Sequence, residues 1–181
     1  MTTPTRAERN NNFGNLSYIA PPAVPFDGQV GLETGENPNR FGVYSTPFKG
    51  ARASCEEILK KVLQLGFTTV RLLIEGKPDA SGEKKGGWAP GFENADEPYE
   101  SRVCGTINDA FGIAKDDPGA ITPDTDITNA VKDPTGQFLE ALSGGIFIVE
   151  SGRYPINLSQ TDHHAAVISA MTARGVKNNG V

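Results

Sequence analysis

Glu150 is the carboxyl group whose sequence context best suits acid chemistry. The apolar run from Gly145 to Val149 ends abruptly at this residue, and Gly152 follows two positions later. Asp133-Pro134 has the form of a helix start, and Gly152 is placed to end the helix. Between them, large apolar residues recur at helical spacing: Phe138, Leu139, Leu142, Ile146 and Val149.

Glu150 is therefore expected in the last turn of a buried helix. The partial negative charge of a helix C-terminus and partial burial both disfavour the ionised carboxylate, so we expect a raised pKa. A carboxyl group that stays protonated near neutral pH can act as a general acid. The alternative is a carboxylate that simply points to solvent at a helix end.

Asparagines near the N-terminus form the densest group of hydrogen-bonding side chains in the chain. Asn10, Asn11, Asn12 and Asn15 all lie within the segment 9–16. Asn tolerates left-handed backbone conformations and can bind its own backbone, so one interpretation is an elaborate turn. The other is a rim of amides that holds the hydroxyl and acetamido groups of a polar ligand. The cluster alone fits both interpretations.

A polar loop precedes the next candidates. Residues 75–87 contain no apolar side chain larger than that of Ala and predict an exposed, flexible loop. The loop ends at Trp88, the single tryptophan of the chain, and Glu93 and Asn94 follow shortly after it. Glu93 is the best candidate for a second catalytic acid and Asp162 the next, but neither has a compelling claim.

Composition excludes several classes of function. With 181 residues the chain fits one domain, and a formal net charge of −5 argues against non-specific binding to nucleic acid. Cys55 and Cys104 stand far apart, so we expect two buried free thiols and neither a metal site nor a cofactor. The first residues have no apolar core and no stretch is long enough to cross a bilayer, so neither a signal peptide nor membrane insertion is expected.

The elements that would position these residues are mostly helices. Apolar periodicity predicts a mainly α domain of α+β class, with long loops and at most a short hairpin around residues 29–31, and residues 41–44 alternate like a separate short strand. Helices are predicted over 47–65, after a cap at Thr68, from Tyr99 onward, up to Glu150, and after a cap at Thr161 or Asp162.

The predicted helix that begins at Tyr99 carries a buried stripe at steps of four: Tyr99, Val103, Ile107 and Phe111. Residues 1–8 are expected to form a mobile polar arm, 9–174 the folded domain, and 175–181 a polar tail.

The order of motifs resembles that of phage virion proteins with the RNNNPGNL signature. Residues 9–16, Arg-Asn-Asn-Asn-Phe-Gly-Asn-Leu, resemble the signature itself, with Phe13 where the pattern usually has Pro. The similarity spans roughly residues 9–172 and continues at Asp27-Gly-Gln29, Arg40-Phe41, Tyr44, Gly50-Ala-Arg-Ala53, Thr69-Val70, Trp88-Ala-Pro90, Glu93-Asn94, Tyr99 and Glu150-Ser-Gly152. A Trp expected shortly before Asp27 is replaced by Val24-Pro-Phe26, and residues 75–87 look like an insertion.

That family is similar to a circularly permuted form of lysozyme-like enzymes, the lytic transglycosylases and flagellar-type glucosaminidases. In those enzymes the Glu-Ser-Gly motif comes first, whereas here it comes last. The resemblance implies a lysozyme-like domain over residues 9–174, in which Glu150 is the catalytic acid and Tyr99 stabilises positive charge on the sugar ring. Core packing is an equally good account of Tyr99. The implied substrate-binding residues are Asn10, Asn11, Asn12, Asn15, Trp88, Glu93, Asn94 and Ser151.

The resemblance implies a virion-associated enzyme that cleaves the glycan strand of bacterial peptidoglycan during cell entry or lysis. The phage particle would deliver it to the host envelope, so other virion proteins or copies of the chain are the implied further partners. The alternative is a structural virion protein that keeps the lysozyme-like fold without activity, since a fold does not establish chemistry.

Overall fold

The computed structural model describes residues 3–36, 38–89 and 99–176. The chain is mainly helical with little sheet, which confirms the predicted α+β class. The elements in chain order are α1 Arg6–Arg9, β1 Gln29–Leu32, β2 Gly42–Tyr44, α2 Pro47–Leu59, α3 Val70–Glu75, β3 Lys77–Pro78, β4 Lys84–Lys85, α4 Tyr99–Phe111, α5 Gln137–Ser151 and α6 Gln160–Ala173. None of the described helices has the length and apolar character needed to cross a membrane.

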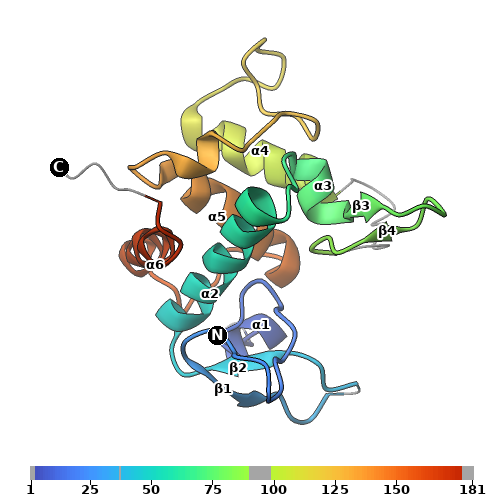
Figure 1. Ribbon diagram of the computed structural model, residues 1–181. Helices are drawn as coiled ribbons and strands as arrows, with labels where there is room; N and C mark the ends of the chain where they lie inside the picture. Colours follow the sequence, from blue (N-terminus) through green and yellow to red (C-terminus); the bar gives the residue numbers. More distant parts are fainter. Residues whose placement is uncertain (1–2, 37, 90–98, 177–181) are drawn as a thin grey trace.

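Helix α2 runs through the middle of the molecule and packs along α6, while α4 packs along α5 (Figure 1). The α1 helix and the β1–β2 pair lie at one end of α2, and α3 with the β3–β4 pair lies toward the other end (Figure 1). A single apolar core joins the helices and includes Ile58, Leu59, Val70, Leu73, Val103, Ile107, Leu139, Leu142, Ile146, Phe147, Val167 and Met171. Cys55 and Cys104 are buried free thiols, as predicted.

Both ends of α2 follow the predicted bounds. The Thr46 hydroxyl accepts a hydrogen bond from the Lys49 amide at 3.2 Å, and Pro47 occupies the first turn. After Leu59 the helix continues with π-type hydrogen bonding over Lys60–Gln64. Gly66 then adopts a positive φ of 70° and ends the segment.

Three predicted helix starts are wrong, because a nearby hydroxyl or glycine provides the start instead. Thr69, not Thr68, caps α3. Ser159, rather than Thr161 or Asp162, caps α6, because its hydroxyl is in reach of the Asp162 amide. Asp133-Pro134 forms a tight turn closed by the Gly136 amide, and α5 begins only after Gly136.

The predicted mobile arm is wrong for residues 5–8, which belong to the folded domain. Thr5 caps α1 in a reciprocal capping box with Glu8. Glu8 is 4% exposed and accepts hydrogen bonds from Arg153 and from the Ile156 amide. Capping and ion pairing thus hold a sequence that carries few apolar residues. The polar tail predicted over residues 175–181 lies mostly outside the described part of the chain, which ends at residue 176.

The expectation of at most one short hairpin is also wrong. The strand predicted at 41–44 is present as β2, but it pairs with β1, so residues 29–32 form no local hairpin of their own. Residues 77–85 form a second antiparallel pair, with Lys77 opposite Lys85 and Pro78 opposite Lys84. Nearly all of its side chains are exposed, as expected for a loop that offers nothing to bury. Phe111, the last member of the predicted α4 stripe, is 42% exposed, whereas Val103 and Ile107 are fully buried.

Candidate active site

The Glu150 carboxyl group lies in the last turn of α5 and is held by two neutral donors. The Tyr99 hydroxyl donates to Oε1 at 2.7 Å, and the Asn15 side-chain amide donates to Oε2 at 2.6 Å. Gly152 ends the helix with a φ of 73°, as the sequence predicts. Residues 15, 99 and 150 are far apart in the sequence, and the fold brings their side chains into contact.

The pKa of Glu150 is raised above its ordinary value. Burial is the main cause, because it disfavours the charged form. The hydrogen bonds from Tyr99 and Asn15 and the positive charge of Arg40 act in the opposite direction but do not cancel the effect of burial. The C-terminal end of a 15-residue helix adds a further unfavourable field for a carboxylate. The predicted direction of the shift is therefore confirmed.

Asn15 is the one member of the asparagine cluster that reaches Glu150. It has a positive φ of 49°, a left-handed backbone conformation that Asn tolerates, and its side-chain Oδ1 is buried without a partner among the described residues.

The other three asparagines build the turn, so the turn interpretation holds for them. Asn12 is fully buried and exchanges hydrogen bonds with Leu16, while also donating to the Gly42 carbonyl. Its predicted role in substrate binding is wrong, because its amide is satisfied inside the protein. Asn11 donates to the Tyr44 carbonyl, and Asn10 donates to Glu33. Neither side chain lines the cleft beside Glu150.

Close packing fixes the turn against the helices. Phe13 is fully buried and its ring lies 5.6 Å from that of Phe147 on α5, which anchors the turn beside the Glu150 helix. A Cβ on Gly50 of α2 would lie 1.5 Å from the Asn11 carbonyl oxygen, so only glycine allows this approach. Phe13 thus links the turn to α5 through its contact with Phe147.

Tyr99 packs in the core, which is one of its two predicted roles, and its hydroxyl also contacts Glu150, whereas stabilisation of charge on a sugar ring stays a prediction. Its ring is 5% exposed and belongs to the core, while its hydroxyl reaches Glu150. Burial is also the main reason that its own pKa is raised well above the usual value, so the phenol stays neutral and remains a donor.

A cleft of 640 Å³ opens beside Glu150. It is lined by Arg6, Gly14, Asn15, Ser17, Arg40, Phe41, Gly87, Trp88, Ala89, Tyr99, Val149 and Glu150. A second cavity of 250 Å³ adjoins it and shares Gly14, Asn15, Ser17, Gly87 and Trp88. A Cβ on Gly14 would lie 2.4 Å from the Trp88 ring, so the indole packs directly on the turn. The shared lining makes one extended groove that passes Trp88, a shape suited to a chain-like ligand.

Three predicted site residues do not contribute described contacts. The Ser151 hydroxyl is buried without a partner among the described residues, and Ser151 does not line the cleft. Glu93 and Asn94 lie outside the described residues. Asp162, the other candidate second acid, is exposed and binds Ser159 at the start of α6, away from the residues that line the cleft.

Sequence reasoning missed four polar or aromatic side chains that line the cleft: Arg6, Ser17, Arg40 and Phe41. Arg40-Phe41 appeared among the shared motifs, but nothing in that pair marks a site. Arg6 was assigned to a mobile arm because its segment is polar. Its position depends on Glu33, which lies 27 residues further along the chain.

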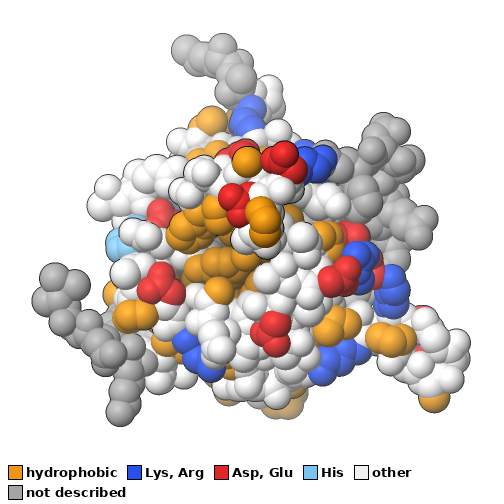
Figure 2. All heavy atoms as spheres, turned by 90° about the horizontal axis from the view of Figure 1, so that it is seen from above, with side chains coloured by type: hydrophobic (Ala, Val, Ile, Leu, Met, Phe, Trp, Pro, Cys, Tyr) orange, Lys and Arg blue, Asp and Glu red, His pale blue; other side chains and the backbone are white. Residues whose placement is uncertain are grey.

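Another cavity, of 550 Å³, lies between α4, α5 and α6 and has less to offer for catalysis. Its lining includes Ala110, Phe111, Ala141, Ile148, Tyr154 and His163. Figure 2 shows hydrophobic side chains gathered in a hollow on the face seen from above in Figure 1. Each ring nitrogen of His163 forms a hydrogen bond, one with the Ser143 hydroxyl at 2.8 Å and the other with the Tyr154 hydroxyl at 3.0 Å. Burial lowers the pKa of His163 to about 4. These hydrogen bonds link α5 to α6, and Glu140, the acid in the lining of this cavity, is hydrogen-bonded to the exposed His164.

A comparison of the sequence with protein-family models gave no match, and a comparison with curated proteins gave no significant match. The chemistry of the cleft is therefore the main guide to function.

Proposed function

We propose that the protein is a phage virion-associated enzyme that cleaves the glycan strand of bacterial peptidoglycan during cell entry or lysis. The observation that carries the proposal is the Glu150 carboxyl group, which has a raised pKa, is held at both oxygens and faces an extended groove. Cleavage of a glycosidic bond needs an acid aimed at the leaving oxygen.

The two donors suit both halves of such a reaction. Before proton transfer, burial favours the protonated form of the Glu150 carboxyl group. After transfer, the hydroxyl of Tyr99 and the amide of Asn15 stabilise the carboxylate that forms, together with the charge of Arg40. Glu150 can then take a proton back, either from water in a hydrolase or from the C6 hydroxyl of muramic acid in a transglycosylase.

The transglycosylase route needs one carboxyl group. Among the described residues that line the 640 Å³ cleft, Glu150 is the only acid, and Glu57, which lines the adjoining cavity, is paired with Lys60 and Lys61. This favours a mechanism in which a single group gives and takes the proton, with a 1,6-anhydro product. The place of Tyr99 beside Glu150 in the cleft lining supports its proposed role, in which the phenol oxygen faces positive charge on the sugar ring. Trp88 offers an aromatic face for the sugar next along the strand.

The decisive experiment is digestion of purified peptidoglycan by the wild-type chain and by Glu150→Gln. The amide keeps the shape of Glu150 but removes the transferable proton, so cleavage should fall by about 10² to 10⁴. Mass spectrometry of the products distinguishes anhydro-muramic ends from reducing ends. Glu140→Gln is a matched control, since Glu140 also lies on α5 but binds His164 at the surface.

Cleavage that survives Glu150→Gln intact would show that the acid is another residue, with Glu93 the next to test. A wild-type chain that cleaves no peptidoglycan would favour the alternative of a structural virion protein that keeps this fold.

A further inference from the structure

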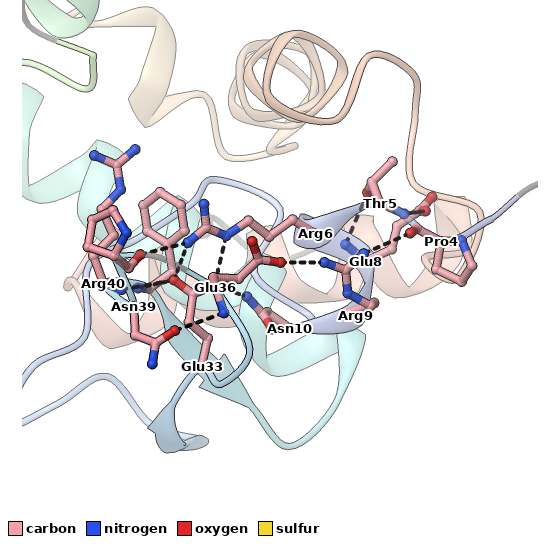
Figure 3. Close-up of polar contacts among 12 residues, drawn as sticks. Pro4, Thr5, Arg6, Glu8, Arg9, Asn10, Glu33, Glu36, Asn39 and Arg40 are labelled. Carbon is pink, nitrogen blue, oxygen red and sulfur yellow. Dashed lines mark hydrogen bonds and ion pairs between the residues drawn. The ribbon is translucent and has the colours of Figure 1, made fainter.

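Among the charged side chains that line the cleft, Arg40 differs from Arg6 and Glu150 in its polar contacts. Its backbone amide donates to Glu33 at 2.9 Å, which fixes the start of the side chain. Its guanidinium carbon then lies 4.5 Å from the centre of the Phe41 ring, and that of Arg6 lies 4.6 Å from the same ring. In Figure 3 the Arg40 guanidinium points away from the Glu33 carboxylate, whereas that of Arg6 points toward it.

The two arginines differ in what neutralises them. Arg6 binds both oxygens of Glu33, at 2.8 Å from Nε and 2.5 Å from Nη2. Within residues 3–36, 38–89 and 99–176, the guanidinium of Arg40 has neither an ion pair nor a hydrogen bond. Arg40 lines the same cleft as Glu150. Among the described residues, Arg40 thus brings to the cleft a positive charge that no ion pair neutralises, in a chain whose formal net charge is −5.

A guanidinium that is held on an aromatic ring and open to a cleft is well suited to an anionic ligand. Its planar set of N–H groups matches the two oxygens of a carboxylate, and charged hydrogen bonds of this kind are stronger than neutral ones. Stacking on Phe41 reduces the rotamer freedom that binding would otherwise remove. A neutral glycan would leave this cation without a partner.

We propose that Arg40 binds a carboxylate carried by the glycan substrate and so makes the cleft select acidic over neutral strands. This inference rests on the proposed function. The carboxylate has two possible sources, the lactyl group of muramic acid in strands without peptides and the peptide stem in intact peptidoglycan. A neutral polymer of N-acetylglucosamine has neither.

The test measures binding to the uncleaved glycan in a Glu150→Gln background, with and without Arg40→Gln. Three probes are compared by calorimetry: an N-acetylglucosamine oligomer, peptide-free peptidoglycan strands, and strands that keep their peptide stems. Arg40→Gln should reduce the preference for acidic over neutral glycan, the ratio of the two Kd values, by about 10-fold or more. Arg40→Lys, which keeps the charge and loses the planar fork, should reduce it less. The acidic probe whose binding weakens identifies the source of the carboxylate.

Arg9→Gln is the control, because Arg9 is an exposed arginine of α1 that pairs with Glu36 outside the cleft. An unchanged Kd ratio in folded Arg40→Gln would overturn the inference. A shift of the pH–activity profile by Arg40→Gln that is equal on neutral and acidic glycan would assign Arg40 to Glu150 instead. These outcomes are separable from failure of the proposed function, which would appear as no cleavage by the wild-type chain.

Discussion

Buried carboxyl groups occur in two regions of this molecule, and their surroundings give them opposite chemistry. Glu8 and Glu33, on the α1 and β1 side, face guanidinium groups and backbone amides. Glu150, at the end of α5, faces one phenol and one side-chain amide. The three groups share burial, which by itself raises the pKa of each.

The donors decide the outcome. For Glu33, the hydrogen bond from Arg6 is the largest influence and, with amides from Arg40 and Phe41, lowers the pKa to about 2. For Glu8, burial is the largest single influence, but Arg153 and the amides of Ile156 and Thr5 together outweigh it, again to about 2. Neutral donors leave the pKa of Glu150 raised. Guanidinium donors thus keep Glu8 and Glu33 ionised in structural ion pairs, whereas the neutral donors around Glu150 leave it an acid able to give up a proton.

Acid conditions should first weaken the ion pairs of Glu33 with Arg6 and of Glu8 with Arg153. The pKa values of Glu8 and Glu33 fall from an ordinary 4.5 to about 2 on folding, so their stabilisation is present above pH 4.5 and is lost as the pH falls toward 2. Each carboxylate contributes at most about 3 kcal/mol over this window. Urea unfolding at pH 7, 4 and 3 measures the loss. A free energy of unfolding that stays constant from pH 7 to 3 would contradict the assignment of both groups.

Removal of one guanidinium should have the next largest effect. Arg6→Met leaves the buried Glu33 carboxylate without its cation and should lower the free energy of unfolding at pH 7 by about 3 kcal/mol. Arg9→Met is the matched control on the same helix, because the exposed Arg9–Glu36 pair should contribute less than about 1 kcal/mol. Equal losses in the two variants, measured by urea unfolding, would show that burial of Glu33 does not matter.

The smallest expected effect concerns the neutral donors. A general acid must be protonated, so activity should fall as the pH rises through the pKa of Glu150. Tyr99→Phe removes a donor that favours the ionised form, and should move this basic limb of the pH–rate profile upward by up to about one unit. Tyr44→Phe is the control, since the buried Tyr44 hydroxyl has no hydrogen-bond partner in the described part of the chain. A basic limb that stays in place in Tyr99→Phe would show that the Tyr99 hydrogen bond does not affect the ionisation of Glu150.

Much of the cleft was accessible from the sequence, because its parts are set by local patterns. Periodicity and Gly152 place Glu150 in the last helical turn, and the stripe on α4 places Tyr99 in the core. The sequence did not distinguish Asn15 from Asn12, because the difference lies in the direction of each side chain from a turn whose packing depends on Phe147 and Gly50. Nothing in the sequence predicted the ion pairs of Arg6 with Glu33 and of Arg153 with Glu8. Arg6 and Arg153 are polar residues in polar segments, and only their distant partners reveal that they are partly buried.

The most direct measurement of the central claim is a carbon-13 NMR titration of the glutamate side-chain carboxyl groups. We expect Glu150 to titrate above the ordinary value of 4.5, while Glu8 and Glu33 titrate near 2 in the folded protein. Glu150→Gln and Glu33→Gln assign the signals of Glu150 and Glu33. A Glu150 signal that titrates at or below 4.5 would contradict the account, because its carboxyl group would then be another structural anion.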